Sequence, residues 1–133
     1  MVELHRDETR IRIKLFGPDL PVDELEVGPQ GLRVGRLSEN NLVLNHREIS
    51  RQHLRIVWRD DQYFVEDLNS SNGAWLNEQR IKARQPQLLS PGDVIRIGPF
   101  LLTVEEIRIV SKSSFMSASS PPDSGGDLPP VVT

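Results

Sequence analysis

The chain has 133 residues, of which 37% are hydrophobic and 26% charged, so it can build one hydrophobic core but not two. It contains no cysteine, which excludes disulfides, thiolate nucleophiles and cysteine-ligated zinc or iron–sulfur sites. Its formal net charge of −3 argues against a general nucleic-acid binder, because such a protein needs a broad basic face.

The two ends of the chain differ in composition from the middle. Residues 1–9 are rich in charge and lack the apolar stretch of a secretory signal, so we predict a mobile arm on a cytoplasmic protein. Residues 111–133 contain seven Ser, four Pro and two Gly, which predicts a disordered tail or linker. No apolar run approaches the roughly 20 residues that cross a bilayer, so we expect no membrane partner. The folded domain then occupies residues 10–110.

Within this domain the apolar residues recur with a period of two, which is typical of half-buried β-strands. Ile11, Ile13 and Leu15 alternate with basic residues and predict a first strand. Further short strands are predicted at residues 32–34 and 41–44.

Two hairpins follow along the chain. Residues 53–58 and 62–66 are predicted strands joined by a tight turn at 59–61, and residues 93–97 and 100–109 are joined by Gly98-Pro99. No stretch of ten or more residues has a helical period free of Gly and Pro. The pattern therefore predicts an all-β sandwich or barrel.

Three predicted loops carry polar residues that suit one ligand. The loops contain Arg36, Ser50-Arg51 and Ser70-Ser71-Asn72. Loops before one strand and after its antiparallel neighbour share an end, which places the second group beside the third. If Arg36 lies there too, two guanidinium groups, hydroxyls and an amide converge. That chemistry can hold a phosphate dianion.

The order and spacing of these residues resemble the forkhead-associated (FHA) domain signature. The residues that carry the resemblance are Gly35-Arg36, Ser50-x-x-His53 and Asn72-Gly73, with supporting context at Asn41-Leu-Val-Leu44, Asp67-Leu68 and Asn77. The motifs span residues 35–77, and the strand pattern extends the resemblance over residues 10–110.

The resemblance implies a two-sheet antiparallel β-sandwich that binds phosphothreonine peptides through loops at one end. It implies that Arg36 and Ser50 bind the phosphate and that Arg51 adds a second cation. It further implies that Ser71 is an additional donor and that Asn72 binds the ligand main chain just after the phosphothreonine. The implied partner is a phosphothreonine-containing protein or peptide.

The same resemblance assigns a structural role to three other residues. Gly35 permits the backbone shape of the first loop, His53 ties the loops together, and Gly73 allows a turn. Ala74 stands where the family commonly has Thr, and we interpret that position as structural.

Two alternatives compete with the phosphopeptide reader. The sandwich could bind an unmodified partner or drive oligomerisation. Ser50, His53 and Asp67 also supply the residue types of a hydrolase triad, but no Gly-x-Ser-x-Gly motif is present, so we do not expect an enzyme. The three histidines lack metal-ligand spacing, and no cofactor or metal is predicted.

The expected oligomeric state is a monomer. Thr9 follows two acidic residues in the predicted arm. Once phosphorylated, it could dock into the loops of a second copy and link molecules head to tail.

Overall fold

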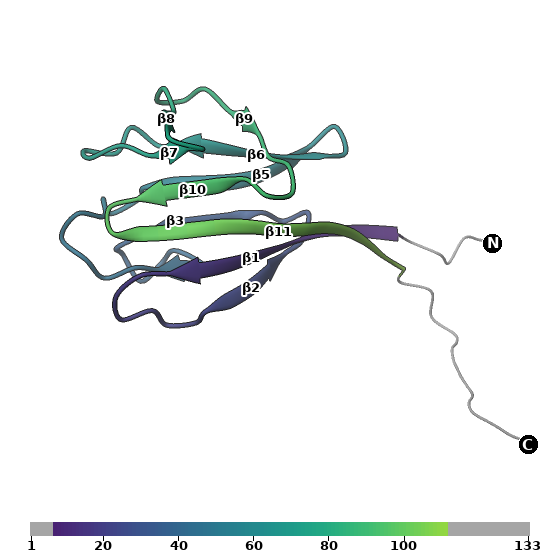
Figure 1. The fold of residues 1–133 in the computed structure, drawn as a ribbon, viewed down its shortest axis with the longest axis horizontal. Helices are drawn as coiled ribbons and strands as arrows, with labels where there is room; N and C mark the ends of the chain where they lie inside the picture. Colours follow the sequence, from purple (N-terminus) through teal and green to yellow (C-terminus); the bar gives the residue numbers. More distant parts are fainter. Residues whose placement is uncertain (1–6, 112–133) are drawn as a thin grey trace, which may run out of the picture. The chain divides into compact units, whose positions relative to one another are not determined.

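The computed structural model describes the backbone of residues 7–111 and the side chains of residues 9–107. These residues form two β-sheets, and Figure 1 shows the longest strand, β11, lying between β10 and β1. The six-stranded sheet has the spatial order β2 (Glu24–Val27), β1 (Asp7–Phe16), β11 (Phe100–Ser111), β10 (Val94–Ile97), β7 (Trp75–Leu76) and β8 (Gln79–Arg80). The five-stranded sheet has the order β4 (Leu42–Val43), β3 (Leu32–Gly35), β5 (Leu54–Arg59), β6 (Gln62–Asp67) and β9 (Gln87–Leu88).

The core is built from the inward-facing residues of both sheets. Ile11 and Ile13 from β1 are fully buried in one cluster with Leu54 and Ile56 from β5. The apolar residues of the alternating pattern therefore face the space between the two sheets. The predicted β-sandwich is confirmed. Pairing is antiparallel in the described ladders except between β3 and β4, which are parallel.

The predicted hairpins are also confirmed. β5 and β6 pair over six residues across a turn in which Asp60 and Asp61 have φ of 54° and 62°. Two successive left-handed residues form the hairpin turn whose twist matches the flanking strands. β10 and β11 pair from Ile97↔Phe100 onward, as the pattern around Gly98-Pro99 predicts.

Four strands were not predicted from the sequence. β2 holds four residues, and β7, β8 and β9 hold two each. Three of them pair with a longer neighbour, as when Val27 of β2 lies opposite Ile11 of β1, and β8 pairs with β7. Whether these short segments form strands therefore depends on the tertiary structure and not on their local sequence.

The boundary predicted for the amino-terminal arm differs from the structure. β1 begins at Asp7, so Asp7, Glu8 and Thr9 belong to a strand, and Tyr63 Oη donates a hydrogen bond to Thr9 O at 2.7 Å. The rest of the predicted arm, and residues 112–133 of the predicted tail, lie outside the described residues. Within residues 7–111 there is no helix, and so none suited to crossing a membrane.

Candidate functional site

The three loops that follow β3, β4 and β6 of the five-stranded sheet meet through hydrogen bonds. The first loop (36–41) follows β3, the second (44–53) follows β4, and the third (68–74) follows β6. Arg36 N donates to Ser50 O at 3.0 Å, and Ser71 N donates to Ser50 Oγ at 3.0 Å. The predicted meeting of these loops is therefore confirmed, and Ser50 stands at its centre.

A glycine allows the first and second loops to approach so closely. A Cβ on Gly35 would collide with Arg51 O and lie 2.7 Å from Asn40 Nδ2. Asn40 is buried in this contact and donates from Nδ2 to both Leu37 O and Arg51 O. The predicted structural role of Gly35 thus has a definite cause, which is the space that a side chain would occupy.

His53 connects the second loop to the third from inside the core. Ser50 N donates to its Nδ1 at 3.1 Å, so Nε2 carries the proton and donates to Gly73 O at 2.8 Å. The side chain is fully buried, and burial lowers its pKa below the ordinary value, against the raising effects of Gly73 O and Asp67. The ring is therefore neutral at pH 7 and acts as a bridge, which is the role predicted for it.

The third loop is shaped by its own polar side chains. The Asp67 carboxylate accepts hydrogen bonds from Ser70 N and Ser70 Oγ, and Gly73 N donates to Ser70 Oγ. Gly73 has a φ of 85°, in the left-handed region that favours glycine. Asn72 Nδ2 donates to Glu48 O at 3.0 Å, which ties the tip of this loop to the second loop.

The five predicted ligand-binding residues keep hydrogen-bonding capacity for a ligand. Arg36 and Arg51 are exposed, and no ion pair or hydrogen bond between described residues engages either guanidinium group. Ser50 Oγ accepts one hydrogen bond and can still donate its own proton. Asn72 has one amide proton and Oδ1 left, and the Ser71 hydroxyl is exposed. This arrangement suits a compact anion with several acceptor oxygens.

Two contributors to this end were missed in the sequence. Asn40 gave no signal, because a buried amide between two loop carbonyls follows no spacing rule. The β10–β11 turn also reaches the second loop, since a Cβ on Gly98 would lie 3.2 Å from Glu48 Cβ. Gly98 was recognised as part of a turn, but no local pattern indicates its approach to Glu48.

The hydrolase triad is not assembled. Both ring nitrogens of His53 bind main-chain atoms, so neither accepts a hydrogen bond from Ser50 Oγ, which itself accepts one from Ser71 N. The Asp67 carboxylate binds Ser70. The geometry thus gives that alternative no support. The described part of the chain also contains no group of three or more His, Cys, Asp or Glu placed to hold a metal ion.

Comparison with known proteins agrees with this geometry. The FHA domain model matches residues 32–98, a segment that includes all three loops. The chain belongs to the forkhead-associated domain family. Among its relatives, the transcriptional regulatory protein EmbR of Mycobacterium tuberculosis is 43% identical over 65 residues, which is 49% of this chain and 16% of EmbR. The present FHA domain thus spans a small part of that relative.

Solved FHA structures superimpose on the described fold. EmbR of Mycobacterium tuberculosis in complex with a low-affinity phosphopeptide matches with a TM-score of 0.61 and 30% identity, over 71% of this chain and 24% of that chain. A structure from a study of phosphothreonine-dependent FHA domain interactions matches with a TM-score of 0.62 and 28% identity, over 72% and 95%. The phosphopeptide in the first of these structures is bound by EmbR.

Proposed function

We propose that this FHA domain is a non-catalytic interaction module that binds phosphothreonine-containing proteins or peptides at its loop end. The observation that carries the proposal is the junction of the three loops, where Arg36 N and Ser71 N both bind Ser50 and where the guanidinium groups of Arg36 and Arg51 form no ion pair or hydrogen bond with the described residues. The phosphopeptide complex of the EmbR relative supports the ligand class.

Each residue has a chemical role in this proposal. Arg36 and Ser50 bind the phosphate oxygens, Arg51 supplies a second positive charge, and Ser71 adds a donor. Asn72 binds the ligand main chain after the phosphothreonine through the amide atoms that Glu48 O does not use. The fork of a guanidinium group matches two phosphate oxygens, which an ammonium group does not.

The expected affinity is micromolar. A phosphate carries about −1.5 to −2 charges at pH 7. Hydrogen bonds to charged groups contribute roughly 1.5–3 kcal/mol each, and a micromolar complex requires about 8 kcal/mol. Two arginines and two or three neutral donors supply that free energy, while the exposure of the site keeps it screened by salt.

Calorimetric titration of the full chain tests the proposal. The probe is a phosphothreonine peptide selected from an oriented library, beside its unphosphorylated form. Arg36→Ala should weaken binding by about 100-fold. The reason is that the charged hydrogen bonds between one guanidinium group and the phosphate contribute a binding free energy of about 3 kcal/mol. Arg33→Ala, which removes an exposed arginine of β3 three residues before Arg36, is the matched control and should bind like the parent.

Three results would contradict the proposal in different ways. Undiminished binding by Arg36→Ala would remove the phosphate-site assignment. Equal affinity for phosphothreonine and phosphoserine peptides would remove the threonine preference, since one buried methyl contributes roughly 10- to 200-fold at most. Equal binding of the unphosphorylated peptide would favour the phosphate-independent module.

The remaining expectations about partners are proposals of the same kind. Docking of a phosphorylated Thr9 into a second copy requires the first residues of β1 to leave the sheet, because Thr9 O accepts the hydrogen bond of Tyr63. Sedimentation of a Thr9-phosphorylated sample tests the head-to-tail link, which a strictly monomeric result would exclude. The cytoplasmic location stays a prediction.

A further inference from the structure

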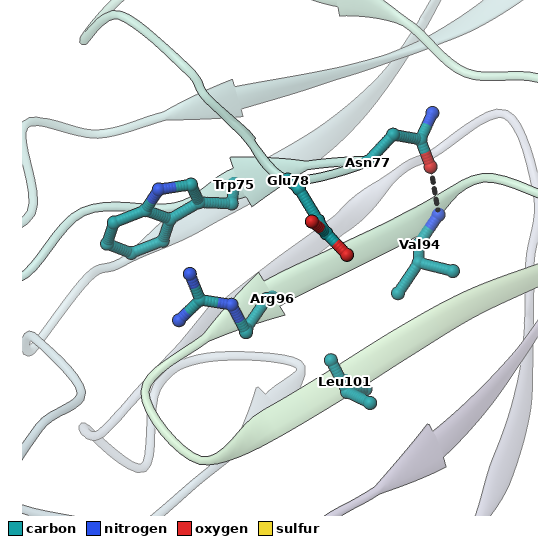
Figure 2. Close-up of a pocket in the computed structure, with 6 residues that line it drawn as sticks. All are labelled: Trp75, Asn77, Glu78, Val94, Arg96 and Leu101. Carbon is teal, nitrogen blue, oxygen red and sulfur yellow. Dashed lines mark hydrogen bonds between the residues drawn. The ribbon is translucent and has the colours of Figure 1, made fainter.

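One row of side chains crosses the outer face of the six-stranded sheet beside the third loop. In the strand register Leu101 lies opposite Arg96, Arg96 opposite Trp75, and Trp75 opposite Arg80. Cross-strand partners point to the same face, so the indole of Trp75 is flanked by two arginines. Figure 2 shows the side chain of Arg96 extending toward the indole.

The indole orders both guanidinium groups without using their donors. Arg96 Cζ lies 4.2 Å from the centroid of the Trp75 ring, and Arg80 Cζ lies 5.5 Å from it. No hydrogen bond between described residues uses the N–H donors of Arg80 or Arg96, so these donors remain available to a ligand. Neither arginine forms an ion pair with a carboxylate of the described chain. An anion bound here therefore meets cations that are already partly ordered.

A groove with an apolar floor accompanies these charges. It has a volume of about 700 Å³ and is lined by Trp75, Asn77, Glu78, Val94, Arg96 and Leu101. Leu101 is 38% exposed, and Trp75 and Val94 are half-buried, so apolar surface remains accessible to a ligand. Among the described residues that line it, the only carboxylate belongs to Glu78, whose side chain lies over the groove in Figure 2.

The row is continuous with the proposed phosphopeptide site. A Cβ on Gly73 would lie 2.8 Å from Arg80 Nε, so the guanidinium group of Arg80 packs directly on the third loop. Asn72, which we propose binds the ligand main chain after the phosphothreonine, is the residue before Gly73. A peptide that leaves Asn72 toward its carboxyl end can thus reach Arg80 and then the groove.

We propose that the Trp75 groove binds an acidic segment of the partner, located on the carboxyl side of the phosphothreonine. The proposal rests on the proposed function. Charge complementarity supports it, because Arg96 in the lining and Arg80 on the other side of Trp75 carry two positive charges, whereas the lining contains one carboxylate, that of Glu78. Glutamate and aspartate beside aliphatic residues suit a groove whose floor is apolar and whose cations offer planar forks.

The experiment uses the two tryptophans of the full chain as reporters. Trp75 lines the groove, whereas Trp58 packs against Tyr63 with ring centroids 4.8 Å apart and serves as the internal control. The indole N–H signals are followed by NMR during titration with three peptides: phosphothreonine with an acidic carboxyl flank, with a neutral flank, and with an acidic amino flank. Affinities are measured in parallel by calorimetry.

Two substitutions should change the affinity for the acidic carboxyl flank in opposite directions. Arg96→Ala should reduce the preference for acidic over neutral flank by about two- to fivefold, and Glu78→Gln should increase it by about twofold, as is typical of exposed charge pairs. Arg59→Ala is the matched control, because Arg59 also lies over an aromatic ring, 5.6 Å from the Phe64 centroid. It should leave the preference unchanged.

The outcomes separate the groove from the phosphate site. A shift of the Trp75 signal with the acidic carboxyl flank alone supports the proposal. Binding of all three peptides with an unmoved Trp75 signal would overturn it and leave the proposed function intact. Failure to bind any phosphopeptide would overturn both. A Trp75 shift on raising the protein concentration without peptide would assign the groove to a second copy instead.

Discussion

The two arginine pairs of this FHA domain are positioned by different physical means. At the loop end, Arg36 and Arg51 are fixed through their main chains, which join the hydrogen bonds among the first and second loops. On the sheet face, Arg80 and Arg96 are placed by strand register and by stacking on Trp75. The loop end therefore depends on buried polar bridges, whereas the sheet face depends on packing at the surface.

This difference predicts that the loop end is far more sensitive to small changes in buried residues. Buried polar groups that lose a partner destabilise the fold, whereas exposed stacked charges contribute little to stability. The following predictions test the contrast from the largest expected effect to the smallest.

The largest effect is expected for Gly35→Ala. The new methyl would collide with Arg51 O, and overpacking of this severity costs about 3 kcal/mol of unfolding free energy. Gly92→Ala is the control. Gly92 has a φ of 92°, and a methyl there would meet no described atom within 4 Å, so only backbone strain of about 1 kcal/mol is expected. Urea unfolding measures both, and equal losses would contradict the close-approach explanation.

A somewhat smaller effect is expected for His53→Gln. The substitution breaks the bridge between Ser50 N and Gly73 O, and unsatisfied buried groups cost about 2 kcal/mol. Phosphopeptide affinity should fall as well, because the second and third loops lose their connection. Arg96→Ala, in the other region, should change the free energy of unfolding by less than about 0.5 kcal/mol. Similar losses in the two variants would erase the contrast between the regions.

The free energy of unfolding should depend on pH through the same His53 bridge between Ser50 N and Gly73 O. Burial lowers the pKa of His53, so the unfolded chain takes up a proton more readily than the folded one once the pH falls below the ordinary value of 6.5. The stability contributed by neutral His53 is full above pH 6.5 and declines from there toward the lowered pKa. The free energy of unfolding, measured without ligand from about pH 7.5 to about pH 5, should show this decline, because a histidine titrates roughly in that range. The variant His53→Gln should show a flatter pH dependence. An unchanged slope in the variant would exclude His53 as its source.

The smallest effect concerns salt. At an ionic strength of about 1 M the Debye length is roughly 3 Å, and exposed charge pairs are largely screened. The preference for an acidic carboxyl flank should then disappear, while the phosphothreonine peptide still binds more tightly than its unphosphorylated form. A flank preference that survives high salt would mean that apolar contacts with Val94 or Leu101, not Arg96, produce it.

The longer strands and the meeting of the loops could be predicted because both follow from local patterns. The alternation around Ile11 and Ile13 fixes which face of β1 is buried, and antiparallel hairpins return their loops to the same end. The Trp75 row could not be predicted, because β7 and β8 hold two residues each and acquire their register only from β10. Asn40 was missed for a similar reason, since its partners lie on two different loops.

By itself, the order of residues determined the all-β class, the hairpins and the motif that marks the FHA family. These features depend on side-chain period and on turn chemistry, which act over a few neighbouring residues. Only the tertiary structure decided why Gly35 and His53 take the roles that the motif implies, and that Arg80 and Arg96 flank one indole. The causes are the close approach of Arg51 O to Gly35 and the bond of His53 Nε2 to Gly73 O. Those facts depend on which distant segments pack together, and close packing is a property of the folded chain as a whole.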